Sequence, residues 1–226
     1  KRIGKAEAVG GMLEIEAEET VLLFCDGANL LYHEKEAERP VKHQLLLEFE
    51  DHTAFTASIQ MYGGVWCFKK GEFDNPYYLV AKEKPSILSE DFSLEYYKGL
   101  LSVKGIEKLS VKAFLATEQR IPGLGNGVLQ DILYTAGIHP KRKMSTLSVE
   151  ERKNIFDSIK STISEMIELG GRDTEKDLFG RNGGYHTKLS KNTVDKPCPT
   201  CGNTIVKEAY LGGSIYYCPG CQVYIK

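Results

Sequence analysis

The chain has 226 residues, of which 42% are hydrophobic and 27% are charged, and its formal net charge is −2. This length suits one large domain or two small ones with proper hydrophobic cores. No apolar run is long enough to span a bilayer and no signal peptide is visible, so we expect a soluble cytoplasmic protein with no membrane partner. The first residue is Lys1 rather than Met, and we expect part of the natural start to lie upstream.

The small net charge hides a difference between the two halves of the chain. Residues 1–52 contain six Lys or Arg and twelve Asp or Glu, whereas residues 104–143 contain seven basic and three acidic residues. Residues 172–226 are also basic, with eight against five. A polyanionic partner is therefore expected on the second half of the protein.

The first part of the chain, residues 1–83, consists of short apolar runs broken by turn signals. This pattern predicts an antiparallel β-sandwich or barrel. The expected strands cover residues 1–9, 12–17, 21–25, 29–33, 44–50, 53–59 and 64–68.

From Lys84 to residue 190 the apolar residues recur at helical spacing. Ser148 and Glu151 form a capping box that opens a long helix, and glycines at 170 and 171 end it. Two earlier helices are expected over residues 106–114 and 128–136, with a glycine-rich loop over 121–126 between them.

The last segment, residues 191–226, carries two Cys-x-x-Cys knuckles separated by sixteen residues. Four thiolates complete a tetrahedron around Zn²⁺, and this spacing is typical of a closed structural site. The residues between the knuckles read as two strands around a Gly-rich tip, which predicts a β-hairpin zinc finger. Two disulfides are the alternative, but paired thiols at this spacing usually bind metal in an intracellular chain. The predicted ligands of a single structural Zn²⁺ are Cys198, Cys201, Cys218 and Cys221.

The loop before the second expected helix, Pro122 to Asn126, is a candidate anion site. It exposes backbone N–H groups at a helix N-terminus, where the helix dipole favours a negative charge. Glycines such as Gly125 allow a phosphate close to the backbone, and the Asn126 side chain can cap the helix or donate a hydrogen bond to the phosphate. An Asn-capped turn between packed helices remains the alternative.

Three stretches taken together resemble a known family. They are Lys112, separated by thirteen residues from the Asn126 that ends Gly-Leu-Gly-Asn, then Ala136-Gly-Ile-His-Pro140, and the four-cysteine finger. This combination resembles the formamidopyrimidine-DNA glycosylase/endonuclease VIII family, most strongly over residues 104–221. The resemblance implies an α+β fold: an N-terminal antiparallel β-sandwich over residues 1–83, a helix-two-turn-helix domain over 84–190, and a zinc-finger hairpin over 191–226.

The resemblance also implies a reaction and a partner. Members of this family flip a damaged base out of duplex DNA and attack the sugar with an N-terminal proline amine, and a neighbouring glutamate acts as acid and base. The implied partner is damaged or abasic double-stranded DNA, bound by a monomer in the bacterial cytoplasm, near the nucleoid. By the same resemblance Lys112 and Asn126 would each bind a phosphate.

The chain departs from the family pattern at several positions. The Pro-Glu pair that starts the family's chains is absent from these 226 residues, so no catalytic residue is assigned. Met12 follows the Gly-Gly step where the family has a lysine, and Gln60-Met61-Tyr62-Gly63 replaces Arg-Arg-Phe-Gly. Tyr62 remains as a candidate wedge in the base stack, or as a tyrosine packed on a strand. In the finger tip Gly213 takes the place of an arginine, which leaves its neighbour Ser214 as the candidate contact.

Three lost cationic contacts predict weaker and less salt-sensitive DNA binding. Arg172, in the segment where the family approaches the extruded base, is a candidate compensating contact or else a surface cation. Three hypotheses follow: a base-excision glycosylase and abasic-site lyase whose upstream residues supply Pro-Glu; a non-catalytic zinc-containing paralogue that recognises damaged or kinked DNA; and a module whose zinc ribbon binds a protein.

Overall fold

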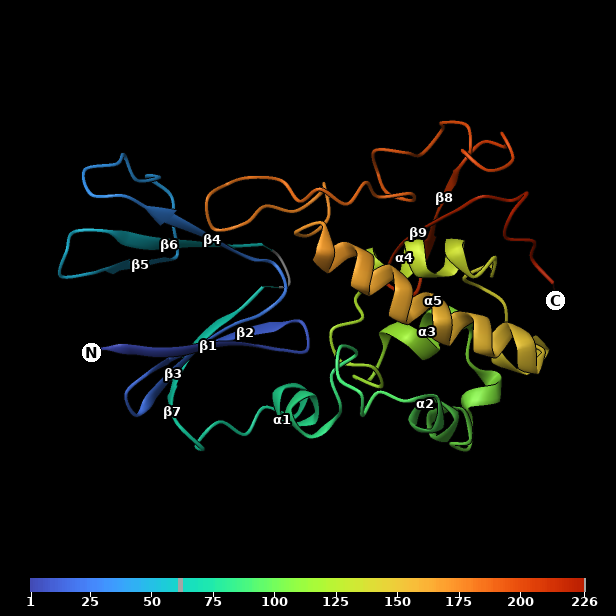
Figure 1. Ribbon diagram of the computed structural model, residues 1–226, viewed down its shortest axis with the longest axis horizontal. Helices are drawn as coiled ribbons and strands as arrows, with labels where there is room; N and C mark the ends of the chain where they lie inside the picture. Colours follow the sequence, from blue (N-terminus) through green and yellow to red (C-terminus); the bar gives the residue numbers. More distant parts are fainter. Residues whose placement is uncertain (61–62, 226) are drawn as a thin grey trace.

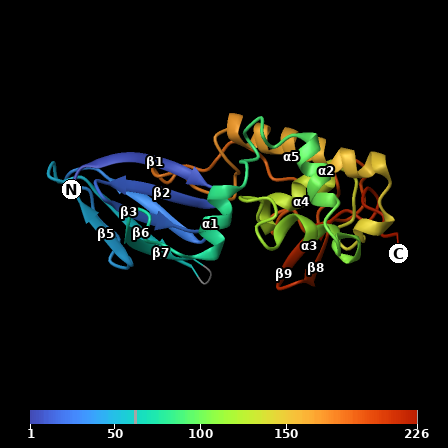
Figure 2. The same cartoon turned by 90° about the horizontal axis from the view of Figure 1, so that it is seen from below.

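The computed structural model describes residues 1–60 and 63–225. Its β-rich and helical halves lie side by side along the long axis, and the C-terminal finger packs on the helices (Figures 1 and 2). None of the helices in these residues combines the length and the apolarity needed to cross a membrane.

The β-rich half is an antiparallel sandwich, as predicted. One sheet has the strand order β1-β2-β3-β7 and the other has the order β4-β6-β5. Ile15, Phe24 and Ala57 are buried in one apolar cluster of this half. Burial alternates over the first four residues of β3, where Val21 and Leu23 are buried and Leu22 is only partly buried, because successive side chains of a strand point to opposite faces. The strands are β1 (Ile3–Val9), β2 (Met12–Ala17), β3 (Thr20–Phe24), β4 (Ala28–His33), β5 (Leu45–Glu48), β6 (Ala54–Ile59) and β7 (Val65–Lys69).

Helix α1 (Pro76–Glu83) lies at the end of the β-rich half, where the sequence pattern had predicted only strands. Asn75 caps it by accepting hydrogen bonds from the N–H groups of Tyr77 and Tyr78, and a proline occupies its first turn. The carboxylate of Glu14 on β2 is buried, accepts from the Tyr78 hydroxyl and binds Lys82 Nζ at 2.9 Å. This ion pair, buried only on the Glu14 side, attaches α1 to the sheet.

The helical half packs around one core that includes Phe114, Leu133 and Ile155. The predicted capping box is present: Ser148 accepts from the N–H of Glu151, and the Glu151 side chain accepts from the N–H of Ser148. The remaining elements are α2 (Leu94–Leu101), η1 (Ile106–Lys108), α3 (Val111–Ala116), α4 (Asn126–Thr135), η2 (Met144–Thr146), α5 (Val149–Glu168), β8 (Val206–Tyr210) and β9 (Gly213–Tyr217).

The helix predicted over residues 106–114 is not continuous. The 3₁₀ turn η1 ends at Lys108, and Ser110 starts α3 by accepting a hydrogen bond from the N–H of Ala113. The N–H of Val111 donates to the carbonyl of Arg142 instead of bonding within a helix. The serine cap and this long-range hydrogen bond explain the break. Helix α2 was also missed by the sequence pattern.

Contacts between the halves include the following two. The β1–β2 turn meets the loop before α4 so closely that a Cβ on Gly10 would lie 3.1 Å from Cβ of Pro122. Residues 172–189, here called the crossing loop, extend from the helical half to β4 (Figure 1). There the N–H of Tyr32 donates to the carbonyl of Leu178 at 2.8 Å, and the rings of Tyr32 and Phe179 meet edge to face. The domain boundaries after residues 83 and 190 stay a prediction.

Candidate metal centre and nucleic-acid interface

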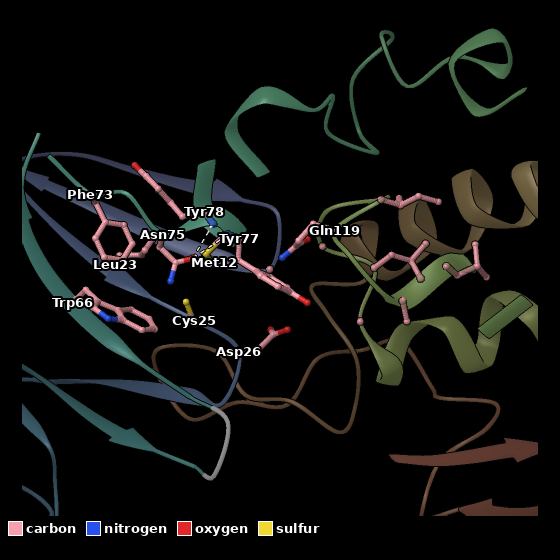
Figure 3. Close-up of a pocket in the computed structure, with 17 residues that line it drawn as sticks. Met12, Leu23, Cys25, Asp26, Trp66, Phe73, Asn75, Tyr77, Tyr78 and Gln119 are labelled. Carbon is pink, nitrogen blue, oxygen red and sulfur yellow. Dashed lines mark hydrogen bonds between the residues drawn. The ribbon is translucent and has the colours of Figure 1, made fainter. Parts of the chain in front are cut away.

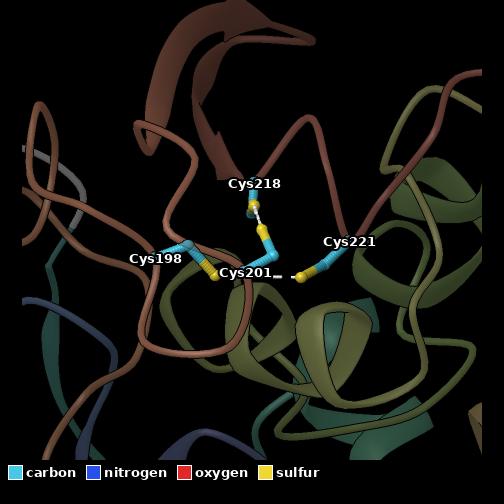
Figure 4. A group of neighbouring side chains, drawn as sticks. All are labelled: Cys198, Cys201, Cys218 and Cys221. Carbon is cyan, nitrogen blue, oxygen red and sulfur yellow. Dashed lines mark hydrogen bonds between the residues drawn. The ribbon is translucent and has the colours of Figure 1, made fainter.

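The four finger cysteines form one cluster (Figure 4). Their sulfur atoms all lie within 4.8 Å of one another, and the thiols are free rather than joined in disulfides. Sulfurs bound to one Zn²⁺ at about 2.3 Å would be about 3.8 Å apart in a tetrahedron. Cys198 and Cys221 are 3.8 Å apart and Cys201 and Cys218 are 3.3 Å apart, so the donor set suits a tetrathiolate metal site.

Two side chains outside the knuckles fix this cluster to the helical half. The Tyr134 hydroxyl lies 3.0 Å from Sγ of Cys198, and Gln222, which is fully buried, accepts from the N–H of Cys218 and donates to the carbonyl of Ile138. Burial acts to raise the pKa of the Cys198 thiol, but hydrogen bonds from Tyr134 and from backbone N–H groups outweigh it and lower the pKa to about 6. The thiolate form of Cys198 is therefore favoured at neutral pH, whereas burial raises the pKa of the Cys218 and Cys221 thiols, which would lose their protons on binding a metal.

The hairpin β8–β9 is held by the first turn of α4. Asn126 Nδ2 and Gln130 Nε2 both donate to the carbonyl of Ser214, at 3.0 and 3.2 Å. Gln130 Oε1 accepts from the N–H of Tyr216 at 3.1 Å. The predicted contacts Asn126 and Ser214, which lie 88 residues apart, therefore meet in space.

Lys112 extends from α3 to the same place. Its residue is only 4% exposed, its ammonium donates to the carbonyl of Tyr210, and burial lowers its pKa. A Cβ on Gly213 would lie 3.6 Å from Lys112 Nζ and 3.4 Å from Asn126 Nδ2. No carboxylate pairs with Lys112 within the described residues. A buried ammonium without a counter-charge beside a helix N-terminus attracts an anion.

The sequence suggested two roles for Asn126, and one of them, capping α4, is not present in the structure. Gly125 occupies the N-cap position and offers no side-chain cap, and Asn126 is the first residue of the helix. Its amide is directed to the finger instead of capping its own helix. The N–H groups at the start of α4 are therefore not satisfied by an Asn126 cap.

Arg172 reaches the start of α4 from the other side. A Cβ on Gly127 would lie 2.6 Å from Arg172 Nη1, so the guanidinium rests directly on the backbone there. Its side chain is 13% exposed and is paired with Glu175. Arg172 is thus close to the candidate site, but Glu175 neutralises much of its charge. Tyr62, the predicted wedge, lies outside the described residues.

A cleft separates the halves next to this site. A cavity of about 360 Å³ is lined on the sheet side by aromatic residues such as Trp66 and Tyr77 (Figure 3). Beyond it lies a larger hollow of about 1210 Å³, lined by Asn126, Arg172 and much of the crossing loop. Asp26 lines both, and burial together with the charge of Glu175 raises its pKa. Met12 and Gln60, at positions where the resemblance leads us to expect cations, also line the larger hollow.

Sequence reasoning missed the residues that assemble the site. Gln130 and Asp131 are buried polar side chains on a helix whose other buried residues are apolar, which is a signal that the sequence did contain. The Asp131 carboxylate accepts from the N–H groups of Lys188 and Leu189, at 2.9 and 2.8 Å, and so fixes the end of the crossing loop. Nothing local in the sequence indicates the partner of Gln222.

The fold and the cysteine cluster define a two-part protein: a β-sandwich joined to a helical half that carries a hairpin with four cysteines able to hold a metal ion. Residues 84–177 match the family model described as the formamidopyrimidine-DNA glycosylase H2TH domain. The chain is 31% identical over 191 residues to a formamidopyrimidine-DNA glycosylase of Prochlorococcus marinus, covering 81% of this chain and 64% of that protein. It is 30% identical over 207 residues to one of Listeria monocytogenes, covering 88% and 73%.

Solved structures give the same result for the fold. The MutM (Fpg) protein of Thermus thermophilus superimposes with a TM-score of 0.82 at 23% identity, covering 98% of this chain and 83% of that chain. A complex of Lactococcus lactis Fpg with DNA containing an abasic site also gives 0.82 at 22% identity, covering 98% and 82%. The chain belongs to the formamidopyrimidine-DNA glycosylase family, which confirms the resemblance drawn from the sequence. It spans 64 to 73% of the two glycosylases compared above.

Proposed function

We propose that this protein binds damaged duplex DNA as a base-excision repair protein. The observation that carries the proposal is the convergence of Lys112, Asn126 and the backbone of Gly213 and Ser214 at the start of α4. The Lactococcus lactis structures, with nearly the same fold, are complexes with DNA containing an abasic site or an oxidised pyrimidine. This likeness supports duplex DNA as the ligand of the corresponding face.

The chemistry of this site favours a phosphate. The Lys112 ammonium has three N–H donors, and one of them is used by the carbonyl of Tyr210. A phosphate placed between Lys112 and the start of α4 would supply the counter-charge that the buried ammonium lacks. It would also accept hydrogen bonds from N–H groups in the first turn of the helix. One phosphate would thereby neutralise the buried Lys112 ammonium and accept hydrogen bonds at the start of α4, both of which would otherwise cost free energy.

One structural Zn²⁺ on the four cysteines completes the proposal. Metal binding would fold the hairpin, and the folded hairpin presents Ser214 to Asn126, so the metal supports the phosphate site without touching DNA. We place the protein in the cytoplasm as a monomer, following the family.

No residue of these 226 is proposed as catalytic. Base removal and strand cleavage need an amine nucleophile and a proton-transferring carboxylate, and the family's Pro-Glu pair does not occur in these residues. The second candidate function is a non-catalytic paralogue that recognises damaged or kinked DNA. It is favoured by Met12, Gln60 and Gly213, which stand where the family uses cations.

The test measures fluorescence anisotropy of duplexes with and without an abasic-site analogue. Lys112→Met and Asn126→Ala should weaken binding about tenfold each, and Lys112→Met should reduce the salt slope by about one unit. Lys153→Ala is the control. It removes an exposed lysine of α5, so the affinity for duplex should change only by the small effect of one surface charge. Equal affinity of all four proteins would refute the site. Borohydride trapping of the full-length product on abasic duplex decides between the two functions, because only the enzyme forms a covalent adduct.

A further inference from the structure

The last turn of α4 places the hydroxyl of Tyr134 between two groups of the first knuckle. The Tyr134 oxygen lies 3.0 Å from Sγ of Cys198 and 2.7 Å from Oγ1 of Thr200. Tyr134 belongs to neither Cys-x-x-Cys motif and precedes Cys198 by 64 residues. The helical half therefore supplies a polar group directly to one of the predicted metal ligands.

The direction of both hydrogen bonds is fixed once Cys198 is in the form that binds a metal. That form is the thiolate, which has no proton and can only accept. The single proton of the Tyr134 hydroxyl then points to the sulfur, and the Tyr134 oxygen accepts from the hydroxyl of Thr200. The result is a directed chain of hydrogen bonds from Thr200 through Tyr134 to Cys198.

Burial makes the hydrogen bond to Cys198 the more important of the two. Cys198 is 3% exposed and lies with Leu189 and Ile205 in an apolar cluster against which Tyr134 packs. Little water reaches a sulfur in such a place, and a buried charge that loses a hydrogen bond costs free energy. Thr200 is exposed, so water can replace its hydroxyl.

The second sulfur of the same knuckle provides the contrast. Asn203 Nδ2 donates to Sγ of Cys201 at 3.3 Å, but both residues are exposed, and water can take the place of this amide. Among the residues that the structure describes, Tyr134 is the one side chain outside the finger with a hydrogen bond to a finger sulfur. The contact at Cys198 is therefore the one that solvent cannot supply.

We propose that Tyr134 is a positioning residue of the metal centre, whose hydroxyl donates to the metal-bound thiolate of Cys198 and so raises the affinity of the four cysteines for the metal. The inference rests on the metal site of the proposed function and assigns part of its affinity to a residue of α4. Four thiolates around one Zn²⁺ carry a net negative charge, and a donor to one of them disperses part of that charge. Removing such an outer hydrogen bond typically weakens metal binding about 10- to 100-fold.

The test compares Tyr134→Phe, which removes only the hydroxyl, with Tyr216→Phe, which removes a hydroxyl from the same apolar cluster. Zn²⁺ affinity is measured by competition with a chromophoric chelator. Tyr134→Phe should weaken the affinity about tenfold or more. Tyr216→Phe should leave it unchanged, because this hydroxyl bonds to no cysteine in the described part of the chain. Thr200→Val should cost less than Tyr134→Phe, since water can replace the threonine hydroxyl.

Cobalt(II) in place of zinc gives a readout that a purely structural role would not move. A thiolate that loses a hydrogen-bond donor becomes a stronger electron donor to the metal. The sulfur-to-cobalt charge-transfer absorption should therefore move to longer wavelength in Tyr134→Phe and stay in place in Tyr216→Phe. A weaker affinity with an unmoved band would overturn the inference, because the loss would then come from altered packing.

The remaining outcomes separate the inference from the proposed function. If the unmodified protein binds neither Zn²⁺ nor Co²⁺, the metal site of the proposed function fails. If it binds both ions and Tyr134→Phe has the same affinity, the inference alone is overturned. A larger loss in Thr200→Val than in Tyr134→Phe would also overturn it, because the tyrosine proton would then serve Thr200 instead of the sulfur.

Discussion

Replacing Gly213 by arginine tests whether a phosphate binds between Lys112 and Asn126. The backbone of Gly213 lies outside the left-handed region, unlike that of Gly212, so a side chain is allowed there. A Cβ at this position would lie at ordinary contact distance from Asn126 Nδ2, 3.4 Å, and from Lys112 Nζ, 3.6 Å. The new guanidinium would therefore begin beside both predicted phosphate ligands.

Two opposing terms set the expected size of the effect. A charge-assisted hydrogen bond to a phosphate contributes about 1.5–3 kcal/mol. Without DNA, the arginine repels Lys112: two like charges about 5 Å apart cost about 0.8 kcal/mol in water and about 3 kcal/mol at an effective dielectric constant of 20. Gly213→Arg should thus lower the free energy of unfolding by about 1 kcal/mol, while tightening duplex binding at least about tenfold at 0.1 M salt.

The assay is fluorescence anisotropy over a range of salt concentrations, with thermal unfolding measured in parallel. One added phosphate contact should steepen the plot of log affinity against log salt by about 0.9 units. Gly99→Arg is the matched control, because a Cβ at Gly99 on α2 meets nothing within 4 Å and the added charge lies elsewhere. If both variants tighten binding equally, or if Gly213→Arg leaves the slope unchanged, no phosphate binds between Lys112 and Asn126.

Three further predictions concern stability. Removing metal with a chelator should unfold the hairpin and weaken duplex binding, measured by circular dichroism and anisotropy. Adding one equivalent of Zn²⁺ should restore both the fold of the hairpin and the binding. Duplex binding that survives in the apo protein would contradict the dependence of DNA binding on the metal. Gly183→Ala should cost more than about 2 kcal/mol in thermal unfolding, because its Cβ would overlap the carbonyl of Gly171, and a wild-type melting temperature would refute the packing. The hydrogen bond from Arg142 lowers the pKa of Glu151 below 4.5, so its stabilisation is present above that pH and is lost as the pH falls through the lower folded-state value. Glu151→Gln should therefore cost about 2 kcal/mol at neutral pH and flatten the acid limb of the stability curve, and an unchanged limb would count against the pair.

The features that the sequence predicted correctly are formed by residues close together in the chain. The knuckle cysteines, and the capping box of Ser148 and Glu151, place both partners of an interaction within a few residues, so the spacing alone defines the structure. Helix α1 shows the limit of reading by composition, because its start signal, Asn75 followed by a proline, was present but lay inside a segment dominated by strand-like runs. The break before α3 depends on the local cap of Ser110 and on the hydrogen bond between Val111 and Arg142, and no local pattern encodes the hydrogen bond.

The cleft was beyond sequence reasoning for a different reason. Asp26, Trp66 and Gly125 line the cavity between the halves, and only the docking of the two halves places them together. The same holds for Arg172, whose position at the α4 N-terminus was unknown until the crossing loop was seen. The sequence identified candidate DNA contacts by resemblance, whereas the ion pair with Glu175 that weakens this candidate is a property of the fold.

Helix α4 links the metal centre to the candidate phosphate site through one row of side chains. Asn126, Gln130 and Tyr134 are spaced four residues apart, and residues at this spacing share one face of a helix. They reach, in order, the carbonyl of Ser214, the backbone of Tyr216 and the sulfur of Cys198. The finger is therefore attached to the helix along its length, from the phosphate end to the thiolate end. A disturbance of the knuckles would consequently shift the hairpin against Asn126, so a metal held by the four cysteines would support the proposed phosphate site from a distance.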